Sequence, residues 1–202
     1  MCLTQTSWIS TVSPRIRSFC RTRSHEARVS VKSILLFRHG KSDWKADYPG
    51  DHDRPLAKRG KSAARLMGRF LASCGQVPDI ALTSTALRAR RTLELASESG
   101  GWTCPVEAKS YLYEASPQEI LGQIQQQSDT WNSVLLTGHE PTCSELASGL
   151  IGGGCFRFPT AALMGIDFPA DRWEAVEFGR GVLKWLLIPK LLASAGFDTE
   201  SA

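Results

Sequence analysis

The stretch ILLFRHGKSDW, residues 34–44, begins as an apolar run and ends abruptly in Arg38 and His39. A short, continuous apolar run of this kind is typical of a strand buried on both faces of a parallel sheet. Much later in the chain, VLLTGHEPT, residues 134–142, shows the same pattern and ends in His139. The sequence therefore predicts two central strands that each run directly into a histidine.

Helical patterns alternate with apolar runs along most of the chain. The periodicity predicts helices at 54–73, 86–98, 116–127 and 141–151. The apolar runs predict strands at 33–37, 79–84, 106–113 and 133–138, followed by three closing strands at 161–167, 173–178 and 181–188. Strands separated by helices indicate an α/β fold with three layers (α/β/α) and a mostly parallel central sheet. The closing run of strands suggests antiparallel edge strands.

The length and charge of the chain indicate one folded domain that is close to neutral. A chain of 202 residues is long enough for one well-buried domain and too short for two comfortable ones. The formal net charge is +4, but residues 1–33 hold six Lys and Arg against Glu26, a net +5, which leaves −1 for the remainder. The domain itself is therefore not expected to bind nucleic acid.

The first 32 residues differ in composition from the rest of the chain. They are rich in Ser, Thr and Arg, poor in acids, and hold no apolar segment long enough for a signal peptide or a membrane span. We expect residues 1–32 to be a disordered extension, 33–190 the domain, and 191–202 a C-terminal tail. A cytoplasmic location away from membranes is expected. The alternative is an organellar one, because a transit peptide has the composition of residues 1–32, as does an extension from an upstream start codon.

Six cysteines are scattered along the chain without a C-x-x-C pair or a zinc-like spacing. They are interpreted as reduced thiols. Cys143, four residues after His139, is the one candidate for a catalytic thiol, but a lone buried thiol is the expected state.

The two strand-end histidines are predicted to share one crevice. In open α/β sheets, functional groups gather outside the carboxyl ends of the strands, so His39 and His139 face each other if their strands are neighbours. After the strand at 79–84, Arg88 falls in the opening turns of a helix, where its side chain leans toward the same crevice. Arg38 beside His39 and Arg54 in DHDRPL add further positive charge.

A pocket of two histidines and several arginines with few carboxylates suits a phosphoryl group. Guanidinium groups match phosphate oxygens bidentately, and nearby positive charge keeps His39 neutral and able to attack. A single histidine after a strand is usually a structural, hydrogen-bonded residue, so the prediction rests on the combination. A zinc site of His39, His139 and His52 is the main chemical alternative, although arginines would repel a dication and no acidic ligand has suitable spacing.

Four motifs together resemble those of the histidine phosphatase superfamily, which has the phosphoglycerate-mutase-like fold, and most closely those of its SixA-type phosphohistidine phosphatases. The motifs are LLFRHGKSDW, DHDRPLAKRG, TSTALRARRT and LLTGHEPT, and the resemblance covers about residues 33–190. It implies that His39 attacks phosphorus and becomes a phosphohistidine, while Arg38, Arg88 and His139 clamp the phosphoryl oxygens and Arg54 helps to form the pocket. It implies no metal or cofactor.

The resemblance also suggests an acid that protonates the leaving group. Mutases and sugar phosphatases of the superfamily use a carboxylic acid here, and Glu114 in YLYEASP lies in the corresponding region, with Asp43 and Asp53 as weaker candidates. An imidazole leaving group needs much less acid assistance than an alkoxide. A phosphohistidine phosphatase could therefore work without this residue.

The spacing of the motifs bears on the substrate. Only 14 residues, 41–54, run from RHG to the second arginine, which leaves little chain for a lid over a small metabolite. We therefore expect a monomeric phosphatase that acts on phosphohistidine in a protein. The alternatives are a phosphomonoesterase acting on a small metabolite, or a phosphate-binding protein without catalysis. The charges of KRGKSAARLMGR, residues 58–69, are interpreted as a solvated helix face rather than a docking patch.

Overall fold

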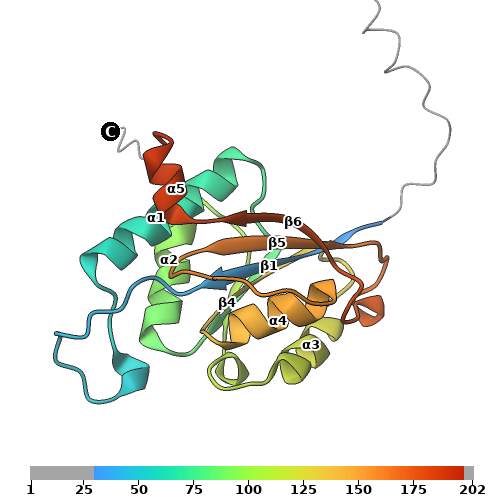
Figure 1. Ribbon diagram of the computed structural model, residues 1–202, viewed down its shortest axis with the longest axis horizontal. Helices are drawn as coiled ribbons and strands as arrows, with labels where there is room; N and C mark the ends of the chain where they lie inside the picture. The colour runs from blue at the N-terminus through green and yellow to red at the C-terminus, as the bar shows by residue number, and fades with distance from the viewer. Residues whose placement is uncertain (1–29, 198–202) are drawn as a thin grey trace, which may run out of the picture.

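Six strands form one sheet in the computed structural model, which describes residues 30–197 of the protein (Figure 1). The sheet order is β3, β2, β4, β1, β5, β6. The strands are β1 (Lys32–Arg38), β2 (Ile80–Ser84), β3 (Val106–Lys109), β4 (Ser133–Gly138), β5 (Leu163–Phe168) and β6 (Val182–Leu187). β5 runs antiparallel to both of its neighbours, and the other pairs are parallel. The predicted α/β fold with a mostly parallel sheet is confirmed.

Strands β1 and β4 lie side by side in the centre of this sheet. They are parallel, and their register places Arg38 opposite Gly138. The ladder continues one residue further, because the His39 N–H donates to the carbonyl oxygen of Gly138 at 3.0 Å. His39 and His139 therefore leave the sheet at the same edge, as the strand pattern predicted.

Helices cover both faces of the sheet (Figure 1). One face carries α1 (Lys58–Ser73), α2 (Leu87–Gly100) and α5 (Pro189–Ser194), and the other carries α3 (Pro117–Gln125) and α4 (Thr142–Ile151). A hydrophobic core lies on each face of the sheet, and alternate side chains of β1 pack into one or the other. Leu35 and Phe37 pack toward α1 and α2, and Ile34 and Leu36 pack toward α3 and α4. This burial on both faces explains the continuous apolar run.

The helix predicted at 54–73 begins four residues later than predicted. A 3-10 turn, η2 (Asp51–Asp53), precedes it, and Arg54 is extended with φ −62° and ψ 120°. The residue before a proline is sterically pushed out of the helical region, which accounts for Arg54. Leu56 then bridges to Ser42, and α1 begins at Lys58.

The strand predicted at 173–178 is wrong. This segment forms a 3-10 turn, η4 (Trp173–Ala175), with Trp173 fully buried. The backbone N–H of Trp173 donates to Asp129 Oδ1 at 2.8 Å, and its indole N–H donates to the carbonyl oxygen of Trp131 at 2.9 Å. These long-range bonds hold the backbone in a turn despite the apolar pattern.

The described chain runs from residue 30 to residue 197. α5 continues the folded part to Ser194, and the ring of Phe197 lies 4.9 Å from that of Phe70. Residues 1–29 and 198–202 lie outside the described residues, and with them most of the predicted N-terminal extension. Between residues 30 and 197 no helix is both long enough and apolar enough to span a membrane.

Candidate active site

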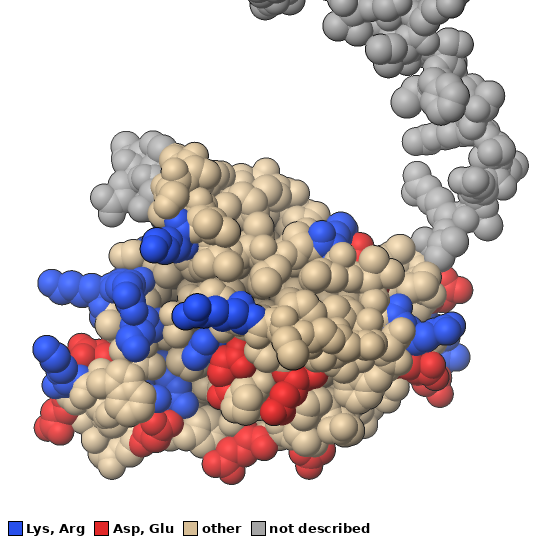
Figure 2. Space-filling model, viewed as in Figure 1, with Lys and Arg blue, Asp and Glu red and all other residues tan. Residues whose placement is uncertain are grey.

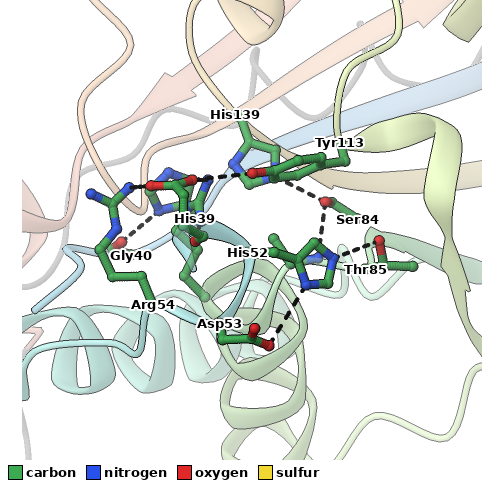
Figure 3. Close-up of polar contacts among 12 residues, drawn as sticks. His39, Gly40, His52, Asp53, Arg54, Ser84, Thr85, Tyr113 and His139 are labelled. Atoms are coloured by element: carbon green, nitrogen blue, oxygen red, sulfur yellow. Dashed lines mark hydrogen bonds and ion pairs between the residues drawn. The ribbon is translucent and has the colours of Figure 1, made fainter. Parts of the chain in front are cut away.

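His39 and His139 lie next to each other at the edge where β1 and β4 end (Figure 3). Their ring centres are 5.0 Å apart, and both side chains are buried. We call the cluster of Arg38, His39, Arg54, Arg88 and His139 the histidine pocket. All five residues were predicted to meet here from the sequence, and the structure places them together.

The backbone around His39 is held by close packing against the helical layer. The N–H of Gly40 donates to Thr92 Oγ1 at 2.9 Å, and the Thr92 hydroxyl donates to the carbonyl oxygen of Arg88 at 2.6 Å. A Cβ on Gly60 would lie 2.3 Å from the carbonyl oxygen of Lys41. Only glycine allows the start of α1 to approach the chain after His39 this closely.

The hydrogen bond of His39 defines its tautomer. Its Nδ1 lies 2.7 Å from the carbonyl oxygen of Gly40. A carbonyl oxygen only accepts, so Nδ1 carries the proton and Nε2 keeps a lone pair. Burial, together with the guanidinium groups of Arg88 and Arg38, lowers the pKa of His39 from 6.5 to about 4. His39 is therefore neutral near pH 7 and can attack an electrophile through Nε2.

His139 is hydrogen-bonded through its other nitrogen. Its Nε2 lies 2.9 Å from Ser84 Oγ, which also accepts from the Ala86 N–H at 3.3 Å. The Ser84 hydroxyl is then free to donate to Nε2, which leaves the proton of His139 on Nδ1. Burial and the neighbouring His39 and Arg88 lower the pKa of His139 to about 3. His139 is thus a neutral N–H donor.

The three arginines reach the histidine pocket from separate segments. Arg38 ends β1, and its Nη1 donates to the carbonyl oxygen of Phe158 at 2.7 Å. Arg88 lies in the first turn of α2, and Arg54 follows η2. The guanidinium carbon of Arg54 lies 3.5 Å from the ring centre of Trp44, so the indole covers one side of this cation.

Several buried N–H donors of the histidine pocket have no hydrogen-bond partner among the described residues. Within residues 30–197 they are Arg38 Nε, Arg54 Nε and Nη1, Arg88 Nε and His139 Nδ1. Leaving a buried donor unpaired costs about 1–3 kcal/mol, so such groups are rare unless they serve a ligand. Their number and positive charge suit an anion with several oxygen atoms, such as a phosphoryl group.

Asp51 completes the cluster and was missed in the sequence. Its carboxylate lies 3.0 Å from both Arg54 Nη2 and Arg88 Nη2, and its carbonyl oxygen accepts from Arg88 Nη1 at 2.6 Å. Although partial burial raises it, the pKa of Asp51 is held below its usual value by these two guanidinium groups. Two buried cations need a counter-charge. The three-residue spacing between Asp51 and Arg54 was the feature of the sequence that could have indicated this ion pair.

Tyr113 also borders the histidine pocket, and no pattern in the sequence indicated it (Figure 3). Its hydroxyl donates to Asp51 Oδ2 at 3.2 Å, and its ring stands edge-on to that of His139, with 5.5 Å between centres. The ring centre of His52 lies 5.1 Å from that of Tyr113, and His52 Nε2 lies 3.1 Å from Thr85 Oγ1. Tyr113 therefore forms part of the rim of the pocket.

Among the described residues, no hydrogen bond or ion pair joins a predicted acid to His39 or His139. Glu114 is exposed and lines a surface hollow with Tyr111 and Gln123. Asp43 accepts from the Lys45 N–H, and Asp53 lies 3.8 Å from His52 Nδ1. The assignment of an acid role to Glu114 stays a prediction. In the described part of the chain, no three His, Cys, Asp or Glu side chains are grouped so that they could hold a metal ion.

Cys143 is a buried thiol, as the sequence predicted. Its side chain packs with the core beside α3 and α4, and burial raises the pKa of the thiol to about 12. A thiol with this pKa stays protonated near pH 7, which makes it a poor nucleophile.

Comparisons with known proteins agree with this geometry. The sequence profile of the histidine phosphatase superfamily (branch 1) matches residues 34–145. The uncharacterised protein Rv1276c of Mycobacterium tuberculosis is 36% identical over 163 residues, which are 76% of this chain and 99% of that protein. The structure of the protein histidine phosphatase SixA complexed with tungstate is similar, with a TM-score of 0.69 and 25% identity over 79% of this chain and 99% of that one.

A more distant likeness concerns the fold alone. Mycobacterial glucosyl-3-phosphoglycerate phosphatase, solved with VO3, has a TM-score of 0.59 and 15% identity over 76% of this chain and 98% of that one. The profile match covers both strand-end histidines and the arginines between them. The chain therefore belongs to the histidine phosphatase superfamily, and to its SixA-like branch.

Proposed function

We propose that the protein hydrolyses phosphohistidine in a protein substrate by way of a phosphohistidine formed on its own His39. One observation carries this proposal: the buried N–H donors of the three arginines and His139, which have no partner within residues 30–197, lie near an imidazole that is neutral and keeps a lone pair on Nε2. A phosphoryl group would satisfy these donors and present its phosphorus to the lone pair of His39.

The first step transfers the phosphoryl group to His39. Nε2 attacks phosphorus in line as the bond from phosphorus to the substrate nitrogen breaks, and the substrate imidazole takes a proton from water. Positive charge develops on the ring of His39, and its Nδ1–H bond to the Gly40 carbonyl oxygen strengthens in response. Arg38, Arg88 and His139 Nδ1 hold the phosphoryl oxygens throughout.

The second step returns the enzyme to its starting state. A water oxygen attacks phosphorus and the bond to Nε2 breaks. One proton of that water stays on the inorganic phosphate, and the other returns to the solvent, where it replaces the proton taken by the substrate imidazole. His39 is again neutral, with its proton on Nδ1. The donors that bind the transferred group serve both steps without moving, because the phosphoryl group stays in place while its neighbours exchange.

A phosphohistidine substrate is favoured because the carboxylate that pairs with the arginines of the histidine pocket, that of Asp51, is a poor proton donor. Although burial raises the pKa of Asp51, the guanidinium groups of Arg88 and Arg54 hold it below its usual value, so this carboxylate stays ionised. An alkoxide leaving group needs a proton donor, whereas imidazole leaves with far less assistance. The similar SixA structure is, by its name, that of a protein histidine phosphatase, which is consistent with this substrate.

A phosphomonoesterase acting on a small metabolite is the second candidate. It would require an acid, and Glu114 is the residue that the resemblance to the superfamily offers. Because Glu114 is exposed and directly follows Tyr113 on the rim, a change in the turn that carries both residues would be needed to bring it to the leaving group.

The test compares kcat/KM for a synthetic phosphohistidine peptide with that for a panel of small phosphomonoesters. His39→Ala serves as the blank, and His52→Ala as the matched control for loss of an imidazole beside the pocket. We expect kcat/KM to be higher for the peptide than for the monoesters. Turnover of the peptide should be lost in His39→Ala and kept in His52→Ala. Turnover confined to a monoester would transfer the assignment to metabolite chemistry, and turnover of neither would leave a phosphate-binding protein without catalysis.

We also infer that hydrolysis needs no metal, because the cationic donor set of the histidine pocket would repel a dication. Turnover by enzyme treated with EDTA should equal that of untreated enzyme. The proposed state is a monomer in the cytoplasm, or in an organelle if residues 1–32 are a transit peptide. Native mass spectrometry and cell fractionation test these assignments.

A further inference from the structure

A groove leads from the histidine pocket across the start of α1 to the start of α5. Two hollows, of about 400 and 600 Å³, form it and share Lys41, Arg59 and Arg157 on their walls. The smaller hollow includes Arg38, and the larger one extends to Lys190. We call the surface lined by Lys41, Arg59, Arg157 and Lys190 the basic groove.

The four cations of the basic groove lack acidic partners within the described part of the chain. None has a carboxylate within 4.0 Å, whereas Arg54 and Arg88 share Asp51. The one carboxylate on the groove walls, Glu140, accepts from the Ser144 hydroxyl, and burial raises its pKa. Lys and Arg side chains gather at the end of the molecule where Figure 1 places the start of α1 (Figure 2).

The floor of the groove is apolar. Ala63 and Leu66 of α1 line its larger hollow together with Pro159, Ile188 and Ala193. A free inorganic anion would use only the charged walls. An apolar floor between basic walls fits a polypeptide segment that carries Asp or Glu side chains and rests its backbone and aliphatic parts on the floor.

The walls of the groove are fixed to the histidine pocket by hydrogen bonds. Arg38 Nη1 donates to the carbonyl oxygen of Phe158, next to Arg157, and the Ala161 N–H is 3.1 Å from the carbonyl oxygens of Arg38 and His39. The Ala57 N–H donates to the carbonyl oxygen of Lys41 at 2.9 Å, which ties the start of α1 to the same place. A segment in the groove is therefore held at a set position relative to His39.

We propose that the basic groove binds an acidic segment adjacent to the phosphohistidine in the protein substrate. This inference rests on the proposed function and adds the chemistry of the flanking sequence that the enzyme selects. It also changes the interpretation of residues 58–69: Arg59 belongs to a docking surface, while Arg65 of the same helix is exposed outside the groove. Charge complementarity raises association with the correct partner and weakens with salt.

The experiment uses two synthetic phosphohistidine peptides that differ only in their flanks, one with four Asp and Glu residues and one with Asn and Gln at the same positions. At low salt, kcat/KM should be about tenfold higher for the acidic peptide, since several exposed charge pairs add. This ratio should approach one at high salt and in the double variant Arg59→Gln/Arg157→Gln. The matched control, Arg65→Gln/Arg90→Gln, removes two exposed arginines outside the groove and should keep the ratio.

Each outcome separates the docking proposal from the proposed function. Equal rates on the two peptides, or a preference that survives in the groove variant, would overturn docking and leave phosphohistidine hydrolysis standing. A groove-dependent preference for small bisphosphates without one for the acidic peptide would assign the groove to metabolites and overturn docking. If neither peptide is hydrolysed while monoesters are, both proposals fail.

Discussion

The two histidines of the pocket occupy equivalent positions at the ends of neighbouring strands, yet they are hydrogen-bonded in opposite ways. His39 donates through Nδ1 to the next carbonyl oxygen in its own chain and keeps Nε2 free. His139 accepts at Nε2 from Ser84 and carries an N–H at Nδ1 that has no partner in the part of the chain that the structure describes. Both rings are neutral, so their hydrogen bonds, rather than their charges, separate their roles. One ring offers a lone pair and the other offers a proton.

The sharpest test of this difference is to replace each histidine by asparagine. The side-chain amide nitrogen of asparagine occupies nearly the position of Nδ1 in histidine, but nothing in asparagine replaces a nucleophilic Nε2. His39→Asn should therefore lower kcat/KM for the phosphohistidine peptide by at least about 10⁴-fold. Rapid quenching with mass spectrometry should detect no phosphoenzyme. Residual turnover close to that of the native enzyme would contradict the assignment of His39.

The same replacement at His139 should be much less harmful. His139→Asn keeps an N–H donor near the position of Nδ1, so a loss of about tenfold is expected, against about 10²–10³-fold for His139→Ala. Phosphoenzyme should still form in both variants. If Asn and Ala are equally damaging at this position, the role of His139 is not that of a donor to the phosphoryl group.

Asp51 holds Arg54 and Arg88 in the structure without substrate. Its carboxylate competes with an incoming anion for Arg54 and Arg88. Asp51→Asn should tighten the binding of inorganic phosphate by about tenfold, measured by calorimetry, because a like charge is removed. It should also lower the free energy of unfolding without phosphate by about 1–3 kcal/mol.

The matched control for this variant is Asp53→Asn. Asp53 lies in the same turn, is exposed, and pairs with neither guanidinium group. Asp53→Asn removes the same charge, and it should change neither the affinity for inorganic phosphate nor the free energy of unfolding. Weaker phosphate binding in Asp51→Asn would show instead that the carboxylate mainly positions the arginines.

The depressed pKa values of the two histidines predict the response to pH. With the pKa of His39 near 4 and that of His139 near 3, both rings stay neutral between pH 7 and pH 5 in the folded protein. Unfolded, each would gain its proton near pH 6.5, so the free energy of unfolding is highest above this pH and falls as the pH drops toward about 4. Imidazole nitrogen shifts in NMR titrations report both protonation and tautomer. Midpoints near 6.5 would contradict the burial argument.

Much of the fold could be predicted from local patterns, and the failures share a cause. The runs at 33–37 and 133–138 report burial on both sheet faces directly, so their strands and their histidines were located. Trp173 is also buried, but its backbone and indole N–H groups are hydrogen-bonded to residues more than forty positions away. The apolar pattern around it wrongly predicts a strand. Burial is visible in the sequence, whereas the partner that fixes the backbone conformation is not.

In the histidine pocket too, a residue could be predicted from the sequence only where a local rule places its side chain. Arg88 could be placed because its side chain leans toward the start of its own helix, which is a local rule. Tyr113 could not be placed from the sequence. The 3-10 turn η3 (Ser110–Leu112) comes just before it, and the buried Leu112 fixes the turn so that Tyr113 faces His139. The resemblance to the superfamily selected Glu114, and the turn presents its neighbour.

Glu114→Gln should therefore have the smallest effect of these substitutions. For the phosphohistidine peptide we expect less than about a threefold change in kcat/KM, because imidazole leaves without a strong acid and the carboxylate lies outside the pocket. The same variant assayed with phosphomonoesters is the informative comparison. A loss of about 10²-fold or more confined to monoesters would mean that Glu114 reaches the leaving oxygen when an ester is bound. Glu145→Gln, an exposed carboxylate on α4, controls for the change in charge.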